Sequence, residues 1–191
     1  MKLILASSSV YRRELLSRLM IPFEVDVPDI DETAQPGETP IRLVERLAIA
    51  KAQAVATRHP QALVIGSDQV AVHGNTLVGK PRTHERAVEQ LRTASGTAVS
   101  LYTGLALINT ATGRIQSEVI PFRVVFRHLT EDQIENYLRK EQPYHCAGSV
   151  KSEGLGVALL ERFEGEDPAT LIGLPLIRLV RMLENEGVTA L

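Results

Sequence analysis

The sequence is poor in the residues that mark several classes of protein. Its 191 residues include one cysteine, Cys146, which excludes an intrachain disulfide and any metal site built from several cysteines. A lone thiol fits a reducing cytosol. No apolar run approaches the roughly 20 residues that span a membrane, and Met1-Lys2 leads into an apolar segment without a signal-peptide pattern. We therefore expect a cytoplasmic protein without a membrane span.

The chain also lacks a large excess of charge of either sign. The net charge of −2 gives no strong attraction for nucleic acid, so basic residues that matter for function would have to gather in a cleft. The five histidines show no metal-ligand spacing. With 44% hydrophobic residues, the chain has enough apolar material for one good core, or for two small lobes that share a sheet.

Strand and helix patterns alternate along the first half of the chain. The patterns predict strands over residues 2–6, 23–27, 62–72, 99–108, 114–127 and 157–163. They predict helices over residues 9–20, 41–58, 83–94, 130–141 and 175–186. Gly66-Ser67-Asp68 is expected to interrupt its strand, and the segments 28–40, 144–156 and 165–174 are expected to be loops. A hairpin after alternating helices and strands predicts an α/β fold with a mixed sheet, and no linker separates domains.

An anion-binding pattern stands near the start of the chain. The apolar segment 2–6 runs into Ser7-Ser8-Ser9 and then into a helix whose first turn carries Arg12 and Arg13. A helix N-terminus presents unpaired N–H groups and partial positive charge, and serine and arginine side chains there suit phosphate. The segment predicts a phosphate-binding corner. It is equally compatible with Ser9 as an ordinary N-cap and with solvated arginines.

Two acidic positions suggest a catalytic or metal-binding role. Asp68 is expected directly after a buried strand, at a sheet edge where ligands of α/β folds bind. It could act as a general base toward water or hold a divalent metal together with Glu32. The alternatives are that Asp68 caps a turn and that Asp31 and Glu32 belong to a solvated acidic loop.

Lysines at the ends of two predicted elements could add positive charge to such a site. Lys51 lies on the second helix, and Lys80 is held between Gly79 and Pro81 in a stiff turn. With Arg12 they would supply three cations that stabilise the charge of a triphosphate as it is split. Each lysine alone is more often a surface residue. The spacing does not match a Walker A loop.

Taken together, these segments resemble the Maf family of nucleotide pyrophosphatases. The likeness runs in family order from residue 3 to about residue 185. The matching stretches are Leu5-Ala6-Ser7-Ser8-Ser9, Tyr11-Arg12-Arg13-Glu14-Leu15-Leu16, Asp31-Glu32-Thr33, Arg46-Leu47-Ala48 with Lys51-Ala52, Gly66-Ser67-Asp68-Gln69, Gly79-Lys80-Pro81, Ala147-Gly148-Ser149 through Glu153-Gly154, and Gly173-Leu174-Pro175-Leu176.

The resemblance implies a fold and a reaction. The fold would be an elongated mixed α/β structure similar to that of the inosine triphosphatases, with two lobes, a central cleft and a single domain over residues 1–191. The reaction would convert a nucleoside triphosphate to a monophosphate and pyrophosphate with a divalent cation, Mg²⁺ or Mn²⁺. A small-molecule nucleotide would be the partner, and the family is compatible with a homodimer.

The resemblance also implies the roles of individual residues. Asp68 would activate water, and Glu32 would help Asp68 hold the metal. The phosphates would be held by Ser7, Arg12, Lys51 and Lys80.

Three positions are similar to the family branch that acts on 7-methyl-GTP: Tyr11, Gln69 and Glu153. A carboxylate at Glu153 could accept the N1–H and N2–H₂ groups of guanine, whereas it would repel the carbonyl oxygens of thymine or uracil. Tyr11 could stack on a methylated, positively charged purine. The branch often carries tryptophan at the position of Tyr11, and the smaller ring is expected to weaken selectivity for the methylated base.

Two other functions stay open at this level. One is a broader house-cleaning pyrophosphatase for non-standard purine triphosphates, because Glu153 suits guanine-like edges in general. The other is a nucleotide-binding regulator of cell division that does not turn its ligand over. A pure binder would need no positioned base, so its activity would survive Asp68→Asn.

Overall fold

The computed structural model describes all 191 residues of the chain. Its strands are β1 (Lys2–Ala6), β2 (Glu24–Val25), β3 (Ala62–His73), β4 (Thr76–Val78), β5 (Ala98–Asn109), β6 (Arg114–Phe126) and β7 (Leu160–Glu164). Its α-helices are α1 (Val10–Ser17), α2 (Pro40–Ala56), α3 (His84–Ala94), α4 (Glu131–Glu141), α5 (Pro168–Ile172) and α6 (Leu176–Glu184), and the short 3-10 turns are η1 (Ala147–Ser149) and η2 (Leu155–Leu159).

All seven strands belong to one mixed sheet. The strand order is β2-β1-β3-β5-β6-β7, and β4 pairs with β3 outside this path. Strand β1 runs parallel to β2 and β3, whereas β4 is antiparallel to β3 and β7 is antiparallel to β6. The predicted α/β class with a mixed, helix-flanked sheet is thus confirmed.

The chain forms two compact units. The first unit comprises residues 1–69, 103–120 and 167–191, and the second comprises residues 70–102 and 121–166. Strands β3, β5 and β6 contribute residues to both units. No helix is long and apolar enough to cross a membrane.

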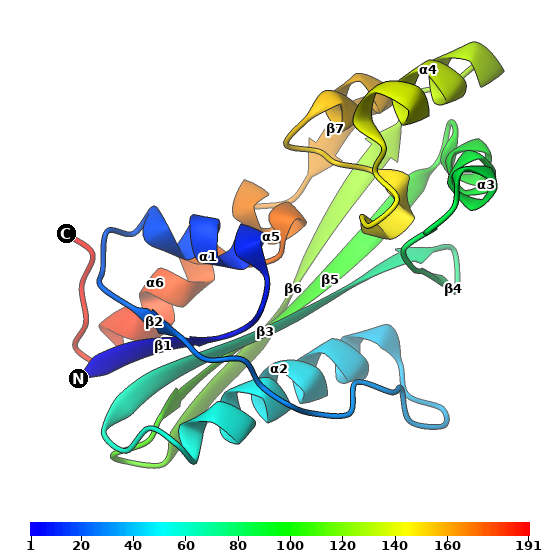
Figure 1. Cartoon of the computed structure of the whole chain (residues 1–191). Helices are drawn as coiled ribbons and strands as arrows, with labels where there is room; N and C mark the ends of the chain where they lie inside the picture. Colours follow the sequence, from blue (N-terminus) through cyan, green and yellow to red (C-terminus); the bar gives the residue numbers. More distant parts are fainter. The chain divides into compact units, whose positions relative to one another are not determined.

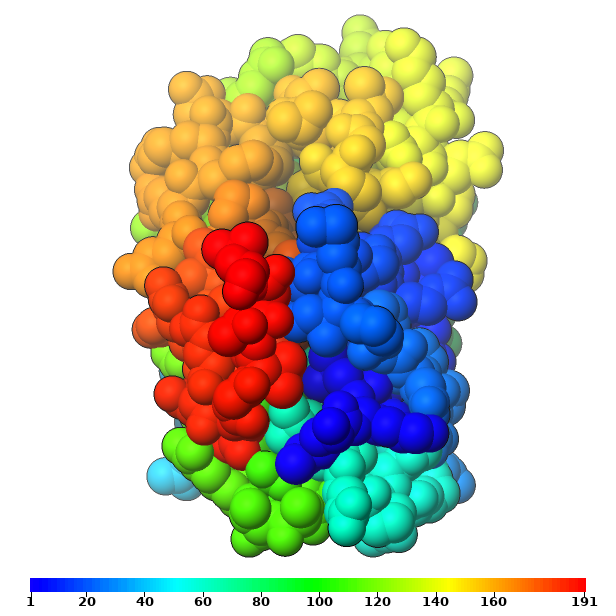
Figure 2. All heavy atoms as spheres, turned by 90° about the vertical axis from the view of Figure 1, so that its left-hand side faces the viewer, coloured from blue at the N-terminus to red at the C-terminus, as the bar shows by residue number.

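In the first unit, the alternation of side chains along β3 builds a core on each face of the sheet. Leu63 and Ile65 pack with residues of α1 and α6 on one face. Ala62 and Val64 pack with residues of α2 on the other. Figure 1 shows α2 on the opposite side of the sheet from α1 and α6. Figure 2 shows the C-terminal residues, in red, beside N-terminal residues, in blue.

The expected interruption of β3 at Gly66-Ser67-Asp68 is wrong. The strand runs without a break from Ala62 to His73, so Asp68 lies inside it and not after it. Gly66 serves close packing instead: a Cβ there would stand 2.0 Å from the carbonyl oxygen of Ala48 in α2. The glycine therefore lets α2 lie directly against the strand.

Other differences concern the lengths of elements and one missed helix. Helix α1 ends at Ser17, before the predicted 20, and β2 keeps only two of the five predicted residues. Strand β7 begins at Leu160, because residues 155–159 form η2. The predicted loop 165–174 contains α5, which Asp167 caps by accepting the N–H of Ala169.

The second unit is built around two helices whose starts were predicted. Thr83 caps α3, and Thr130 forms a capping box with Gln133 at the start of α4. The two helices pack against each other. Tyr137 and Leu138 of α4 are buried.

Candidate active site

The candidate site of the first unit lies where β1 ends. Ala6 is the last β1 residue, and it pairs with Gly66 of β3. Strand β3 continues through Ser67, Asp68 and Gln69, where β1 no longer accompanies it. At this point the chain leaves the sheet through the serine segment 7–9 and enters α1. Polar side chains from both faces of β3 are therefore placed beside the helix N-terminus.

The centre of the site is a buried ammonium between two carboxylates. The Nζ of Lys51 lies 2.7 Å from Oδ1 of Asp68 and 2.9 Å from Oε1 of Glu32. The side chains of Lys51 and Asp68 are only 8% and 11% exposed, whereas that of Glu32 is 58% exposed. Lys51 is thus no surface lysine. It compensates the charge of a carboxylate that the strand holds away from bulk water.

Arg12 is fixed beside this centre. Its backbone N–H donates to the Ser9 hydroxyl, which caps α1, so Ser9 is an N-cap as its position allowed. The Nε of Arg12 donates to the carbonyl oxygen of Gly173 at 2.8 Å. Burial lowers the pKa of the Arg12 guanidinium, and the carboxylates of Asp68 and Glu32 act in the opposite direction. The remaining guanidinium donors have no carboxylate within 4.0 Å and are available for an anion.

The serine segment supplies a second polar group. Ser7 is buried, and its hydroxyl oxygen accepts the backbone N–H of Ser9 at 3.1 Å. The hydroxyl hydrogen keeps its capacity to donate. Tyr11, at the start of α1, is 44% exposed, so its ring can be reached by a ligand.

The side-chain amide of Gln69 is held in one orientation. Its Nε2 donates to the carbonyl oxygen of Thr170 at 2.6 Å and to the hydroxyl of Thr103 at 2.8 Å. A carbonyl oxygen can only accept, so the NH₂ end of the amide must face Thr170. Both amide hydrogens are thereby used, and Gln69 offers a ligand only its carbonyl oxygen.

The segment around α5 was missed as a source of site contacts. The carbonyl of Gly173 accepts from Arg12 and also from the hydroxyl of Ser67 at 3.0 Å, and the carbonyl of Thr170 accepts from Gln69. Backbone acceptors carry no signature in the side-chain sequence. The available signal was the capping pattern Asp167-Pro168 ahead of Gly173, which marks a short helix and its end.

Two of the predicted site residues, Lys80 and Glu153, belong to the second unit. Lys80 is exposed, has no ion-pair partner, and follows β4 in a well-supported turn. The carbonyl oxygen of the preceding Gly79 accepts from the Gln90 side chain at 3.0 Å and from the N–H of Gly148 at 3.3 Å. Glu153 is exposed, and its carboxylate meets the Ser152 hydroxyl at 3.4 Å.

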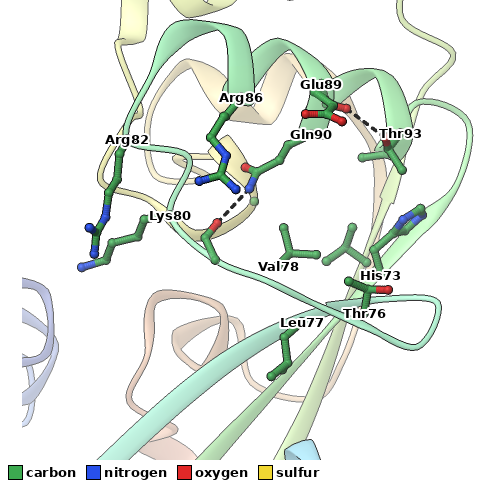
Figure 3. A pocket seen from close by; sticks show the side chains of 14 residues that line it. His73, Thr76, Leu77, Val78, Lys80, Arg82, Arg86, Glu89, Gln90 and Thr93 are labelled. Carbon is green, nitrogen blue, oxygen red and sulfur yellow. Dashed lines mark hydrogen bonds between the residues drawn. The ribbon is translucent and has the colours of Figure 1, made fainter. Parts of the chain in front are cut away.

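A cavity of about 640 Å³ lies within the second unit next to Lys80. Arg82 and Arg86 also line it, although neither was singled out from the sequence. Figure 3 shows Lys80 and Arg82 extending to the same side while Arg86 reaches toward Gln90. Arg82 has a positive φ of 64°, and its N–H donates to the carbonyl of Tyr144 at 3.0 Å. These contacts fix the backbone of a turn that carries two cations.

The structure therefore divides the predicted residues between the units. Within the first unit it brings together Asp68, Lys51, Glu32 and Arg12, with Ser7, Tyr11 and Gln69 on the adjoining elements. No group of three or more His, Cys, Asp and Glu side chains gathers in a way that could by itself hold a metal ion. The acidic oxygens near Lys51 come from two carboxylates.

Comparison with known proteins places the chain in a family. The Maf-like protein family model matches residues 2–186. The chain belongs to the Maf family. The 7-methyl-GTP pyrophosphatase of Nitrosococcus oceani is 60% identical over 189 residues, which cover 99% of this chain and 95% of that protein. The 7-methyl-GTP pyrophosphatase of Nitrosospira multiformis is 59% identical over 187 residues, covering 98% and 94%.

A solved structure offers a more distant likeness. The Staphylococcus aureus Ham1 protein matches 66% of this Maf chain and 71% of its own at 17% sequence identity, with a TM-score of 0.43. The assignment to the Maf family stands on the sequence matches.

Proposed function

We propose that this protein hydrolyses 7-methyl-GTP to 7-methyl-GMP and pyrophosphate. The near full-length identity of 59–60% to two proteins named for that activity supports the proposal. The single structural observation that carries it is the buried pair of Asp68 and Lys51 at the end of β1. A buried carboxylate with one free oxygen and a fixed cation beside it suits an acid–base step next to a polyphosphate.

Asp68 acts as the general base. One carboxylate oxygen faces Lys51, and the carboxylate accepts a proton from a water molecule. The oxygen of that water forms a bond to phosphorus, and the anhydride bond between the α- and β-phosphates breaks. Pyrophosphate leaves with the bonding electron pair. Because the strand and α2 fix Asp68, the base is positioned before substrate arrives.

The phosphates are bound by Arg12, Ser7, Lys51 and Lys80. Arg12 offers the guanidinium hydrogens that Gly173 leaves unused, and Ser7 offers its hydroxyl. Lys51 and Lys80 add positive charge, which offsets the negative charge that develops on the phosphate oxygens. Contacts to phosphate are available to every nucleotide, so they do not discriminate between nucleobases.

Glu32 and Asp68 would hold the divalent cation, Mg²⁺ or Mn²⁺. Carboxylate oxygens are the ligand type that both ions take, and Mg²⁺ keeps waters and substrate oxygens as its other ligands. Two carboxylates that converge on one ammonium fit this demand. When bound, such an ion withdraws negative charge from the phosphate oxygens.

Hydrogen-bond acceptors of the protein select the purine over thymine and uracil. Gln69 presents its carbonyl oxygen because Thr170 and Thr103 occupy its amide hydrogens, and Glu153 presents a carboxylate. Guanine offers N–H donors on its Watson–Crick edge, whereas thymine and uracil flank one ring N–H with carbonyl oxygens. Tyr11 stacks on the purine, where positive charge on the methylated ring favours an aromatic face. We further propose a single Maf-type domain that works in the cytoplasm as a homodimer.

The substitution Asp68→Asn tests the role of Asp68 as the general base. It preserves the shape of the side chain and removes its basicity. We expect pyrophosphate release from 7-methyl-GTP to fall by about 10²-fold or more while the far-ultraviolet circular dichroism spectrum stays unchanged. Turnover close to that of the parent protein would show that Asp68 is not the base.

A further inference from the structure

The loop after α4 carries the carboxylate assigned to base selection. Glu153 lies in the segment 151–156, rich in glycine and serine, and its side chain is exposed. Its one hydrogen-bond partner is Ser152, its neighbour in the chain. A free segment of this composition would leave the carboxylate mobile. Selection between bases needs it in one place, so some other group must hold the loop.

Two side chains of α4 hold the backbone of this loop. The phenolic oxygen of Tyr137 accepts the backbone N–H of Lys151 at 3.1 Å. One turn further along the helix, Oε2 of Glu141 accepts the N–H of Leu155 at 2.7 Å. The other oxygen of Glu141 lies 3.1 Å from the ammonium of Lys151. These contacts fix the loop on both sides of Glu153.

The loop is also closed on itself at a glycine. The carbonyl of Lys151 accepts the N–H groups of Gly154 and Gly156, each at 3.1 Å. A Cβ on Gly154 would stand 2.8 and 2.9 Å from the two carboxylate oxygens of Glu141. The Glu141 carboxylate therefore rests directly on the Gly154 backbone, in space that any other residue would fill.

We propose that Glu141, seated on Gly154 and assisted by Tyr137, is a positioning residue for base selection that holds Glu153 against the purine edge. This inference rests on the proposed function, because it gives Glu153 the base-selecting role described there. Glu141 touches neither the substrate nor the reacting atoms. It acts through the backbone of residues 151–155.

The ionisation of both anchors agrees with these contacts. The Leu155 N–H and the Lys151 ammonium lower the pKa of the Glu141 carboxyl, which therefore stays charged at neutral pH. Burial raises the pKa of the Tyr137 phenol, which therefore stays neutral. A charged acceptor gives the stronger hydrogen bond to an amide, so Glu141 is the principal anchor.

The contact is tested from both of its sides. Glu141→Ala removes the carboxylate, and Gly154→Ala places a Cβ in the space that the carboxylate occupies and so displaces it from the Leu155 amide. We expect each variant to lower the ratio of kcat/KM for 7-methyl-GTP over dTTP by about tenfold, through KM for 7-methyl-GTP. The double variant should lose no more than either single variant, because both remove one contact.

Matched variants separate positioning from folding. Glu141→Gln keeps an oxygen for the Leu155 amide and should restore most of the preference. Glu131→Ala removes a carboxylate of the same helix that pairs with Arg92, far along α4 from the loop, and should leave the preference unchanged. In Glu141→Ala without substrate, amide hydrogen exchange over residues 151–156 should become at least about tenfold faster.

Each contrary outcome has a definite meaning. Faster exchange in the loop with an unchanged preference ratio overturns the inference and leaves the proposed function intact. An equal fall of activity on both substrates, or additive effects of Glu141→Ala and Gly154→Ala on the ratio, also overturns it. A parent protein that shows no preference for 7-methyl-GTP overturns the proposed function, and the inference falls with it.

Discussion

Replacement of Lys51 by methionine removes the ammonium that compensates two carboxylates. Methionine has nearly the length and volume of lysine, so the change removes charge rather than packing. Asp68 then stays as a carboxylate that is 11% exposed and has lost its 2.7 Å partner. Glu32 is 58% exposed and can turn to water, so its loss of the contact contributes little.

The size of the effect follows from this burial. Removing one partner of a buried ion pair destabilises a protein by about 3–5 kcal/mol, because an uncompensated charge stays behind. Since Asp68 retains some contact with solvent, we take the lower end, about 3 kcal/mol. For a chain of this length, each kcal/mol lowers Tm by about 2–4 °C, so we expect a fall of about 6–12 °C.

Two further variants make the measurement specific. Lys2→Met removes a lysine of similar ion-pair geometry, 2.9 Å from Glu24, but with side chains 69% and 56% exposed. It should leave Tm close to that of the parent. The double variant Lys51→Met with Asp68→Leu should recover most of the lost stability, because it removes the unpaired charge along with the pair.

The assay is thermal and urea unfolding followed by circular dichroism, since the chain has no tryptophan for fluorescence. Mn²⁺ should raise the Tm of Lys51→Met more than that of the parent, because both carboxylates become free to bind it. A Lys51→Met variant as stable as Lys2→Met would refute the buried pair. Equal Mn²⁺ effects on Lys51→Met and the parent would refute the assignment of the two carboxylates as metal holders.

Four other changes test separate parts of the structure. The Arg58 side chain, and after it the His59 side chain, lowers the pKa of Asp26 from 3.8 to about 2. The ionised Asp26 therefore stabilises the folded protein above about pH 4, and this stabilisation is lost as the pH falls toward 2. In Asp26→Asn, the free energy of unfolding should change less with pH over that range. Gly66→Ala forces a Cβ against the α2 backbone and should destabilise the protein by about 1–3 kcal/mol or more in urea titrations. Lys80→Ala should raise KM for all triphosphates alike, and a changed base preference would contradict its phosphate role. The double variant Tyr11→Arg with Glu153→Gln should lower kcat/KM for 7-methyl-GTP at least about tenfold and raise kcat/KM for dTTP. An unchanged ratio of the two values would contradict the assignment of Tyr11 and Glu153 to nucleobase selection.

Local signals in the sequence predicted most of the elements. Thr83 and Thr130 mark helix starts because a side-chain cap is a short-range contact. Helix α5 escaped prediction because five residues are too few to show a period. Gly66 was misread as a break because its reason is the approach of α2, which is distant in sequence. A glycine needed for packing and a glycine needed for a turn look alike in one dimension.

The candidate site was predictable in its residue types but not in its pairings. Asp68, Lys51 and Glu32 were each singled out, yet the direct contact of Lys51 with both carboxylates depends on how α2 lies on β3. The polarity of Gln69 depends on a backbone carbonyl at Thr170. Such an acceptor is present at every residue, so the sequence cannot show which one will be used.

Pyrophosphate release from a panel of triphosphates tests whether this protein hydrolyses 7-methyl-GTP. Purified protein is given 7-methyl-GTP, GTP, inosine triphosphate, UTP and dTTP, each with Mg²⁺, with Mn²⁺ and with a chelator, and kcat/KM is measured for each. We expect that 7-methyl-GTP gives the highest value, that pyrophosphate and the monophosphate form in equal amounts, and that the chelator abolishes turnover. Equal values for all purine triphosphates, or binding of 7-methyl-GTP without release of pyrophosphate, would contradict this expectation.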